Sequence, residues 1–127
     1  MSIRCPRCEA QLERIDVPPA AASLFSSSTA GGCPVCLTVV DAGVGDDSAA
    51  SSVLGSVDPA AAAAVWSVIR DLPQLAMSHD RLDRALALAE EQGVDVFLHL
   101  ERLAADPAVD AHFDIDRRRR QLAAFVD

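Results

Sequence analysis

The sequence predicts an α+β protein, with a small β zinc ribbon at its N-terminus followed by a helical domain of about four helices. All four cysteines lie in two Cys-Pro-x-Cys motifs within the first 36 residues. From Asp58 onward, apolar residues recur at helical spacing between signals that start and end helices. A stretch rich in glycine, serine and aspartate separates the two regions. We therefore expect a zinc-ribbon module over residues 1–42, a linker over 43–57 and a helical domain over 58–127.

The two cysteine motifs, Cys5-Pro6-Arg7-Cys8 and Cys33-Pro34-Val35-Cys36, are separated by 24 residues. Two residues between cysteines let one tight turn aim both thiolates at one ion, and two such turns complete a tetrahedron of four sulfurs. Proline after the first cysteine fixes φ and leaves the later N–H groups free to point at sulfur. The sequence thus predicts one structural zinc ion per chain, held by Cys5, Cys8, Cys33 and Cys36.

Iron is the main alternative to zinc, because it also accepts four thiolates in paired motifs. The chain has no tyrosine, and Phe25 is the only aromatic residue before residue 58, so the aromatic core of small iron proteins of this kind is missing. Disulfides or free thiols are a further alternative, which a reducing cytoplasm disfavours.

Three short strands are expected around the motifs, over residues 2–4, 10–16 and 37–42. Leu12 is out of step with the alternation of Ile15 and Val17. Between the motifs, residues 18–25 predict one helical turn started by proline, and residues 26–32 a loose segment. Because large apolar residues are few here, we expect metal to supply most of the ordering, on the order of 10–16 kcal/mol.

Four helices are expected after the linker, over residues 58–72, 78–92, 95–105 and about 109–126. Asp58, Ser78 and Asp95 are the candidate N-caps, and Gly93 is a stop signal. Trp66 lies beside the apolar stripe of the first helix and is expected to be a packing anchor. The histidines have no metal spacing with the cysteines and are expected in ordinary surface or partly buried positions: His79, His99 and His112.

The charge balance is acidic and lacks lysine. The 127 residues include 19 acidic residues against 11 arginines, for a net charge of −8. Such a surface suits a cytosol of very high salt, where the screening length falls to about 3 Å at 1 M. A GC-rich genome is the alternative, and it explains the missing lysines better than the excess of aspartate. No long apolar stretch or signal-peptide core is present, so we expect a cytoplasmic protein without membrane contact.

The run Arg117 to Arg120 is typical of a nucleic-acid-binding patch. On a helix, however, Asp114 and Asp116 stand three and four residues before these arginines and can pair with them. High salt would also weaken binding to phosphates. We therefore expect a solvated face whose charges pair locally.

The chain resembles the small Cys-Pro-x-Cys zinc-finger proteins of haloarchaea, specifically an uncharacterised group with two such motifs and a helical tail. The resemblance rests on the two motifs, on Leu37-Thr38 after the second, and on residues 103–107 and 112–122. It implies a zinc-binding cytoplasmic protein of no established activity. The wider class usually has glycine after the second cysteine of each motif, where φ can be positive, whereas Glu9 and Leu37 stand there in this chain.

The expected function is that of a non-enzymatic adaptor or regulator acting through protein partners, with a second copy of the chain as one candidate partner. Four sulfurs fill the coordination shell and leave no open position for water or substrate. The serines of the linker have no positioned histidine or aspartate, so no catalytic residue is predicted. Two alternatives remain: a nucleic-acid-associated regulator using Arg4, Arg7, Arg14 and the arginine run, and a redox switch whose thiolates release metal on oxidation.

Overall fold

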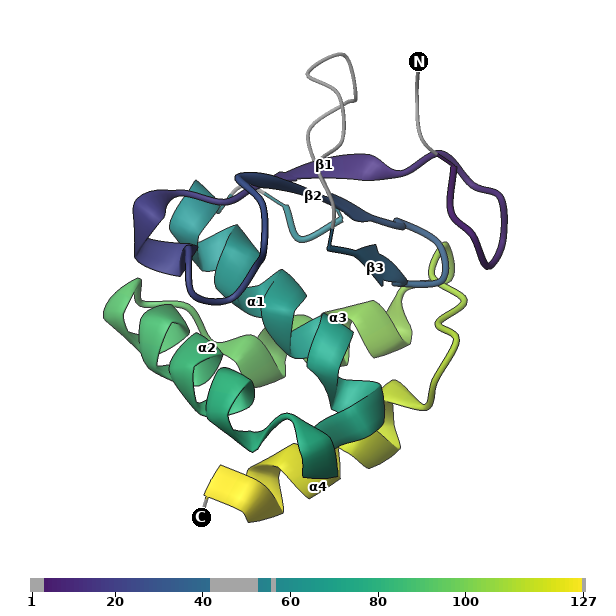
Figure 1. The fold of residues 1–127 in the computed structure, drawn as a ribbon. Coiled ribbons are helices and arrows are strands. Elements are labelled where there is room, and N and C mark those ends of the chain that lie inside the picture. Colours follow the sequence, from purple (N-terminus) through teal and green to yellow (C-terminus); the bar gives the residue numbers. More distant parts are fainter. Residues whose placement is uncertain (1–3, 42–52, 56, 127) are drawn as a thin grey trace.

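The computed structural model describes residues 4–41, 53–55 and 57–126. A three-stranded antiparallel sheet near the N-terminus is followed by four α-helices, which confirms the predicted α+β class (Figure 1). The predicted linker lies mostly outside the described residues, as do residues 2, 3 and 42 of the predicted strands.

The sheet has the order β1-β2-β3, with strands Glu13–Asp16, Thr29–Gly32 and Val39–Val40. Its central strand lies in the segment expected to be loose, and that prediction was wrong for residues 29–32. The small residues of β2 leave room for the Trp66 side chain of α1 to pack closely against the sheet. A Cβ built at Gly32 would lie 2.9 Å from the ring of Trp66 and 3.1 Å from Ile15 Cδ1. Packing against Trp66 therefore overrides the weak strand propensity of this segment.

The remaining N-terminal elements are shorter than expected. Arg4 and Gln11 form an isolated antiparallel bridge, and residues 19–21 form the predicted helical turn as η1 (Pro19–Ala21). Leu12 packs with the cysteines, whereas Ile15 packs in the main core. This explains the break in alternation, because the strand buries residues on two different sides.

The helices are α1 (Pro59–Asp71), α2 (His79–Glu91), α3 (Val96–Ala105) and α4 (Ile115–Val126), with the 3-10 segment η2 (Leu72–Met77) between α1 and α2. Asp58 and Ser78 occupy the predicted N-cap positions without a side-chain capping hydrogen bond. Asp95 does cap α3, since its Oδ1 accepts from the Leu98 N–H at 3.1 Å. Gly93 ends α2 at a φ of 72°.

The fourth helix begins at Ile115 rather than near Val109. Asp114 caps it, accepting from the Arg117 N–H at 3.0 Å. The residues before it run alongside the second cysteine motif, where the Asp110 N–H donates to the Val35 carbonyl at 2.7 Å. Tertiary hydrogen bonds to this motif therefore replace the expected first turns of the helix.

The core is organised around α1, which lies against the sheet on one side and against α2 on another (Figure 1). Trp66 and Ile69 are fully buried, and burial extends around nearly the whole helix rather than along one stripe. One apolar cluster joins N-terminal residues such as Leu24 and Leu37 to residues of all four helices, including Leu122. The two parts of the chain thus share a core, and their division into separate folding units stays a prediction.

A partly buried cluster of charged side chains lies at the C-terminal end of α1. Asp71 is fully buried and accepts from Arg70 Nε and Nη2 at 3.2 and 3.1 Å and from Arg81 Nη2 at 2.9 Å. Arg70 also lies 3.6 Å from an Asp41 carboxylate oxygen and 4.7 Å from the centre of the Phe25 ring. These contacts tie α1 to α2 and to the segment that follows β3.

No helix within residues 4–41, 53–55 and 57–126 combines the length and the apolar character needed to cross a membrane.

Candidate metal centre

The first knuckle, residues 5–10, is a tight turn closed by backbone hydrogen bonds. The Cys5 N–H donates to the Ala10 carbonyl at 2.7 Å, and the Glu9 N–H donates to the Cys5 carbonyl at 3.0 Å. The Arg7 N–H points at Cys5 Sγ, 3.4 Å away. The turn therefore directs an amide dipole at the sulfur, as a thiolate ligand requires.

The second knuckle, residues 33–38, repeats this pattern. The Cys33 N–H donates to the Thr38 carbonyl at 2.9 Å, and the Leu37 N–H donates to the Cys33 carbonyl at 3.2 Å. The Cys36 N–H points at Cys33 Sγ at 3.4 Å. The two knuckles thus share one hydrogen-bond pattern and bring their cysteines together, as the two Cys-Pro-x-Cys motifs predicted.

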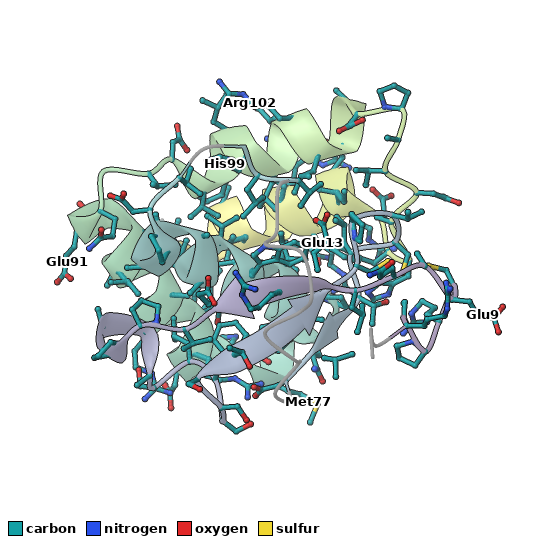
Figure 2. All side chains as sticks on the ribbon, turned by 90° about the horizontal axis from the view of Figure 1, so that it is seen from above. Glu9, Glu13, Met77, Glu91, His99 and Arg102 are labelled. Atoms are coloured by element: carbon teal, nitrogen blue, oxygen red, sulfur yellow. The ribbon has the colours of Figure 1, made fainter. Side chains whose placement is uncertain are left out.

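Both knuckles keep a positive φ at the residue after the second cysteine, although neither has glycine there. Glu9 has a φ of 67° and Leu37 a φ of 63°. A non-glycine residue in this region costs about 1–2 kcal/mol. Leu37 is only 1% exposed, so its burial in the core offsets that cost. Glu9 has no such compensation, because its side chain projects from the outer edge of the molecule (Figure 2).

The four sulfurs form one compact group. All lie within 4.8 Å of one another, with Sγ–Sγ distances of 3.6 Å for Cys5 and Cys36 and 3.5 Å for Cys8 and Cys33. A tetrahedral ion with Zn–S bonds of about 2.3 Å needs sulfurs about 3.8 Å apart. The four cysteines are free thiols, and this arrangement could hold a metal ion.

A threonine and an arginine extend the site beyond the cysteines. Thr38 Oγ1 lies 3.1 Å from Cys36 Sγ and accepts a hydrogen bond from Arg7 Nε at 3.1 Å. With Arg7 as donor, the Thr38 hydroxyl proton is free to point at the sulfur. A guanidinium near four thiolates and a divalent ion would also offset their net negative charge. Sequence reasoning missed this role, although Thr38 stands two residues after a candidate ligand, Cys36, and directly before β3.

The thiols differ in acidity. Burial would raise the pKa of Cys5, but hydrogen bonds from the N–H groups of Cys8 and Arg7 outweigh it and lower the pKa to about 6. Burial raises the pKa of Cys33 to about 12, and it also raises the pKa of Cys36. Loading a metal at neutral pH therefore requires protons to leave Cys33 and Cys36.

The second knuckle is fastened to the helical part of the chain. Besides the contact at Val35, the Cys36 carbonyl accepts from the His112 N–H at 3.0 Å. Burial, and then the charge of Arg7, lower the pKa of His112. The segment between α3 and α4 thus lies against the metal centre, which ties the centre to the two C-terminal helices.

Five of the seven arginines considered for nucleic-acid binding have intramolecular partners for their side chains: Arg4, Arg7, Arg14, Arg118 and Arg119. Arg7 bonds to Thr38, Arg4 Nη1 donates to the Glu9 carbonyl at 3.1 Å, and Arg14 pairs with Asp16 at 2.9 Å. In the C-terminal run, the predicted pair of Arg119 and Asp116 forms at 3.5 Å, and Arg119 also lies 3.4 Å from Glu101. Asp114 caps the helix backbone instead of pairing with side chains, and Arg118 bonds to Gln121 at 3.0 Å.

Within the described residues the histidine side chains do not join the metal-holding group, although the His112 backbone bonds to Cys36. The His79 ring stands edge-on to Phe125 at 4.4 Å, and the His112 ring to Phe113 at 5.0 Å. Burial, followed by the charge of Arg102, lowers the pKa of His99. In the described part of the chain, the group of side chains suited to hold a metal ion consists of the four cysteines. Trp66 is fully buried in the core, in agreement with its expected packing role.

The fold and the site define an α+β protein with a four-cysteine centre suited to a metal ion. The chain belongs to the family of unknown function DUF6276, whose model matches residues 4–126. No curated protein and no solved structure matches the chain.

Proposed function

We propose that the four cysteines hold one structural zinc ion and that the protein acts without catalysis, as an adaptor or regulator of other proteins. One observation supports the zinc assignment: the two knuckles have the same turn geometry and bring their four sulfurs within 4.8 Å of one another. Four thiolates complete the tetrahedral shell of zinc and leave no position for water or substrate, which favours a structural role.

The surroundings of the sulfurs favour zinc over iron. The buried cysteines pack with Leu12, and Ala10 and Val40 lie against this cluster. These are aliphatic residues rather than the aromatic core expected of a small iron protein. Zinc is also redox-inert, which suits an ion that fastens a knuckle to the α3–α4 segment.

Metal analysis of the purified protein tests the zinc proposal. We expect one zinc per chain, and we expect cobalt exchanged into the site to show the absorption of a tetrahedral tetrathiolate centre. The measurement should be repeated on Cys33→Ser, which removes a buried ligand, and on Ser26→Ala as a control away from the cysteines. Equal metal content in the two variants would refute the assignment.

A hollow in the helical part supports the adaptor role. It measures about 260 Å³ and lies between the end of α2, the start of α3 and the end of α4. Its lining includes Leu86, Phe97 and Val126, the last 46% exposed, with the carboxylates of Glu90 and Asp95 among the same residues. A basic partner offering one apolar side chain suits such a surface.

Partner capture from the native lysate tests this role. Val126→Glu should lose a partner that the unchanged protein retains. Met77→Glu is the matched control, because Met77 is 86% exposed and projects elsewhere on the surface (Figure 2). Loss of the partner from both variants, or from neither, would contradict a role for this hollow.

We also propose that the protein works in a halophilic, archaeal cytoplasm. The net charge of −8 without lysine supports this, because carboxylate repulsion is tolerable where salt is high. The midpoint of thermal unfolding should rise steeply with potassium chloride concentration. A midpoint that is highest at low salt would contradict the proposal.

A further inference from the structure

The two knuckles differ in how the rest of the chain covers them. In the first knuckle, residues 6–9 are all exposed. In the second, Cys36 and Leu37 are buried, and the α3–α4 segment donates backbone hydrogen bonds to the carbonyls of Val35 and Cys36. The second knuckle is therefore anchored in the fold, while the first covers the metal centre from the solvent side.

This asymmetry separates the four sulfurs. Cys5, Cys33 and Cys36 are 2%, 0% and 5% exposed, whereas Cys8 is exposed. Each of the three buried sulfurs also lies at hydrogen-bond distance from an N–H or hydroxyl group: Arg7 N, Cys36 N and Thr38 Oγ1. In a loaded site all four ligands are thiolates, so access decides which one an oxidant reaches.

We propose that Cys8 is the oxidation site of the metal centre and that Cys33 is the partner with which it forms a disulfide. The proposal rests on the proposed zinc site and describes its regulation. Cys33 Sγ lies 3.5 Å from Cys8 Sγ, so the second sulfur is in place when the first is oxidised. The co-reactant is a peroxide small enough to reach a surface thiolate.

The chemistry balances in two steps. The Cys8 thiolate attacks one oxygen of hydrogen peroxide, the O–O bond breaks, and sulfenic acid forms at Cys8 while hydroxide leaves. The Cys33 thiolate then attacks the Cys8 sulfur, an S–S bond forms, the S–O bond breaks, and a second hydroxide leaves. Two protons from solvent convert both hydroxides to water. The site loses two of its four ligands and releases the ion.

Release of the ion has a structural consequence. The carbonyls of Val35 and Cys36 belong to the knuckle that holds the α3–α4 segment. The Cys8–Cys33 disulfide then links the knuckles in place of the ion, but Cys36 loses its bond to the metal. The amide groups of Asp110 and His112, which bond to Val35 and Cys36, should therefore exchange with solvent faster. Oxidation of Cys8 would thereby be transmitted to the helical part of the protein.

The test is the order of modification in the zinc-loaded protein. Zinc content is measured first; the protein is then treated with one equivalent of hydrogen peroxide, free thiols are labelled, and the peptides are mapped by mass spectrometry. We expect zinc release in step with the loss of two free thiols, and a first disulfide joining Cys8 to Cys33. First modification at Cys5 or Cys36, or a first disulfide within one knuckle, would overturn the proposal and leave the zinc assignment intact.

Cys8→His supplies a second measurement. Histidine completes three-cysteine zinc sites, and the exposed position has room for an imidazole. This variant should keep its zinc through a peroxide dose that empties the unchanged protein. Equal loss from both would overturn the proposal. If the variant itself holds no zinc, the proposal is judged by the order of cysteine modification in the unchanged protein. Untreated protein without any zinc would refute both this proposal and the proposed function.

Discussion

Replacing Asp71 by alanine is expected to destabilise the protein strongly, although Asp71 lies outside the metal centre. Its carboxylate is fully buried and accepts three hydrogen bonds from Arg70 and Arg81, at distances between 2.9 and 3.2 Å. The Arg70 side chain is only 10% exposed and cannot move into solvent without opening the core. The substitution therefore leaves a buried guanidinium without its main partner.

The two arginines contribute unequally to the expected loss. Breaking a buried ion pair by removing one partner costs about 3–5 kcal/mol. Arg81 is 41% exposed and can turn to water, so its pair adds only about 0–1 kcal/mol. Arg70 keeps Asp41 at 3.6 Å and the Phe25 ring, which offset part of the cost. We therefore expect a loss of about 3 kcal/mol, a large share of the roughly 5–15 kcal/mol typical of a domain.

Urea unfolding of the metal-loaded protein at constant salt measures this loss. Arg81→Ala is the matched control and should lower the free energy of unfolding by less than about 1 kcal/mol. A loss below about 1 kcal/mol for Asp71→Ala, or equal losses for the two variants, would refute the view that a buried charge cluster holds the end of α1.

Gly32→Ala should destabilise the fold by about 1–3 kcal/mol in the same assay, because its Cβ would meet Trp66 at 2.9 Å; an unchanged midpoint would contradict this contact. Glu9→Gly should stabilise the protein by up to about 1 kcal/mol, because it relieves a positive φ, and a loss of stability would argue against strain there. Burial raises the pKa values of Cys33 and Cys36 and favours the thiol form, so their contribution to the stability of the metal-free protein is complete below the ordinary thiol pKa of 9.0. This contribution declines as pH rises above that value, for Cys33 through about 12. Denaturation of the metal-free protein should show this decline, and metal affinity should instead weaken as pH falls, because protons compete for the sulfurs.

The clustering of the four cysteines was the most predictable part of the molecule. A Cys-x-x-Cys motif is a local design, so the spacing alone brings each pair of sulfurs together. The start of α3 was equally local, because Asp95 caps it through the N–H of a residue three positions on. Signals of this kind act within a few residues, although Asp58 and Ser78 occupy their predicted cap positions without the side-chain hydrogen bond.

The features that the sequence could not supply depend on distant contacts. Residues 29–32 contain two glycines and read as a loop, yet they form the central strand because Trp66 packs against Gly32. The sequence predicted a start of α4 near residue 109, which is too early. Residues 110 and 112 instead donate hydrogen bonds to the second knuckle, and no local sequence pattern predicts these contacts. The asymmetric covering of the knuckles arises from the same contacts, so the exposure of Cys8 also became visible only in the fold.

Native mass spectrometry of the protein purified in high salt tests the central claim most directly, since it reports the metal and the state of the thiols in one spectrum. We expect one zinc per chain, lost together with the cobalt-binding capacity when Cys33 is replaced by serine. Iron in the site, or a metal-free chain whose four cysteines remain reduced at saturating zinc, would contradict it.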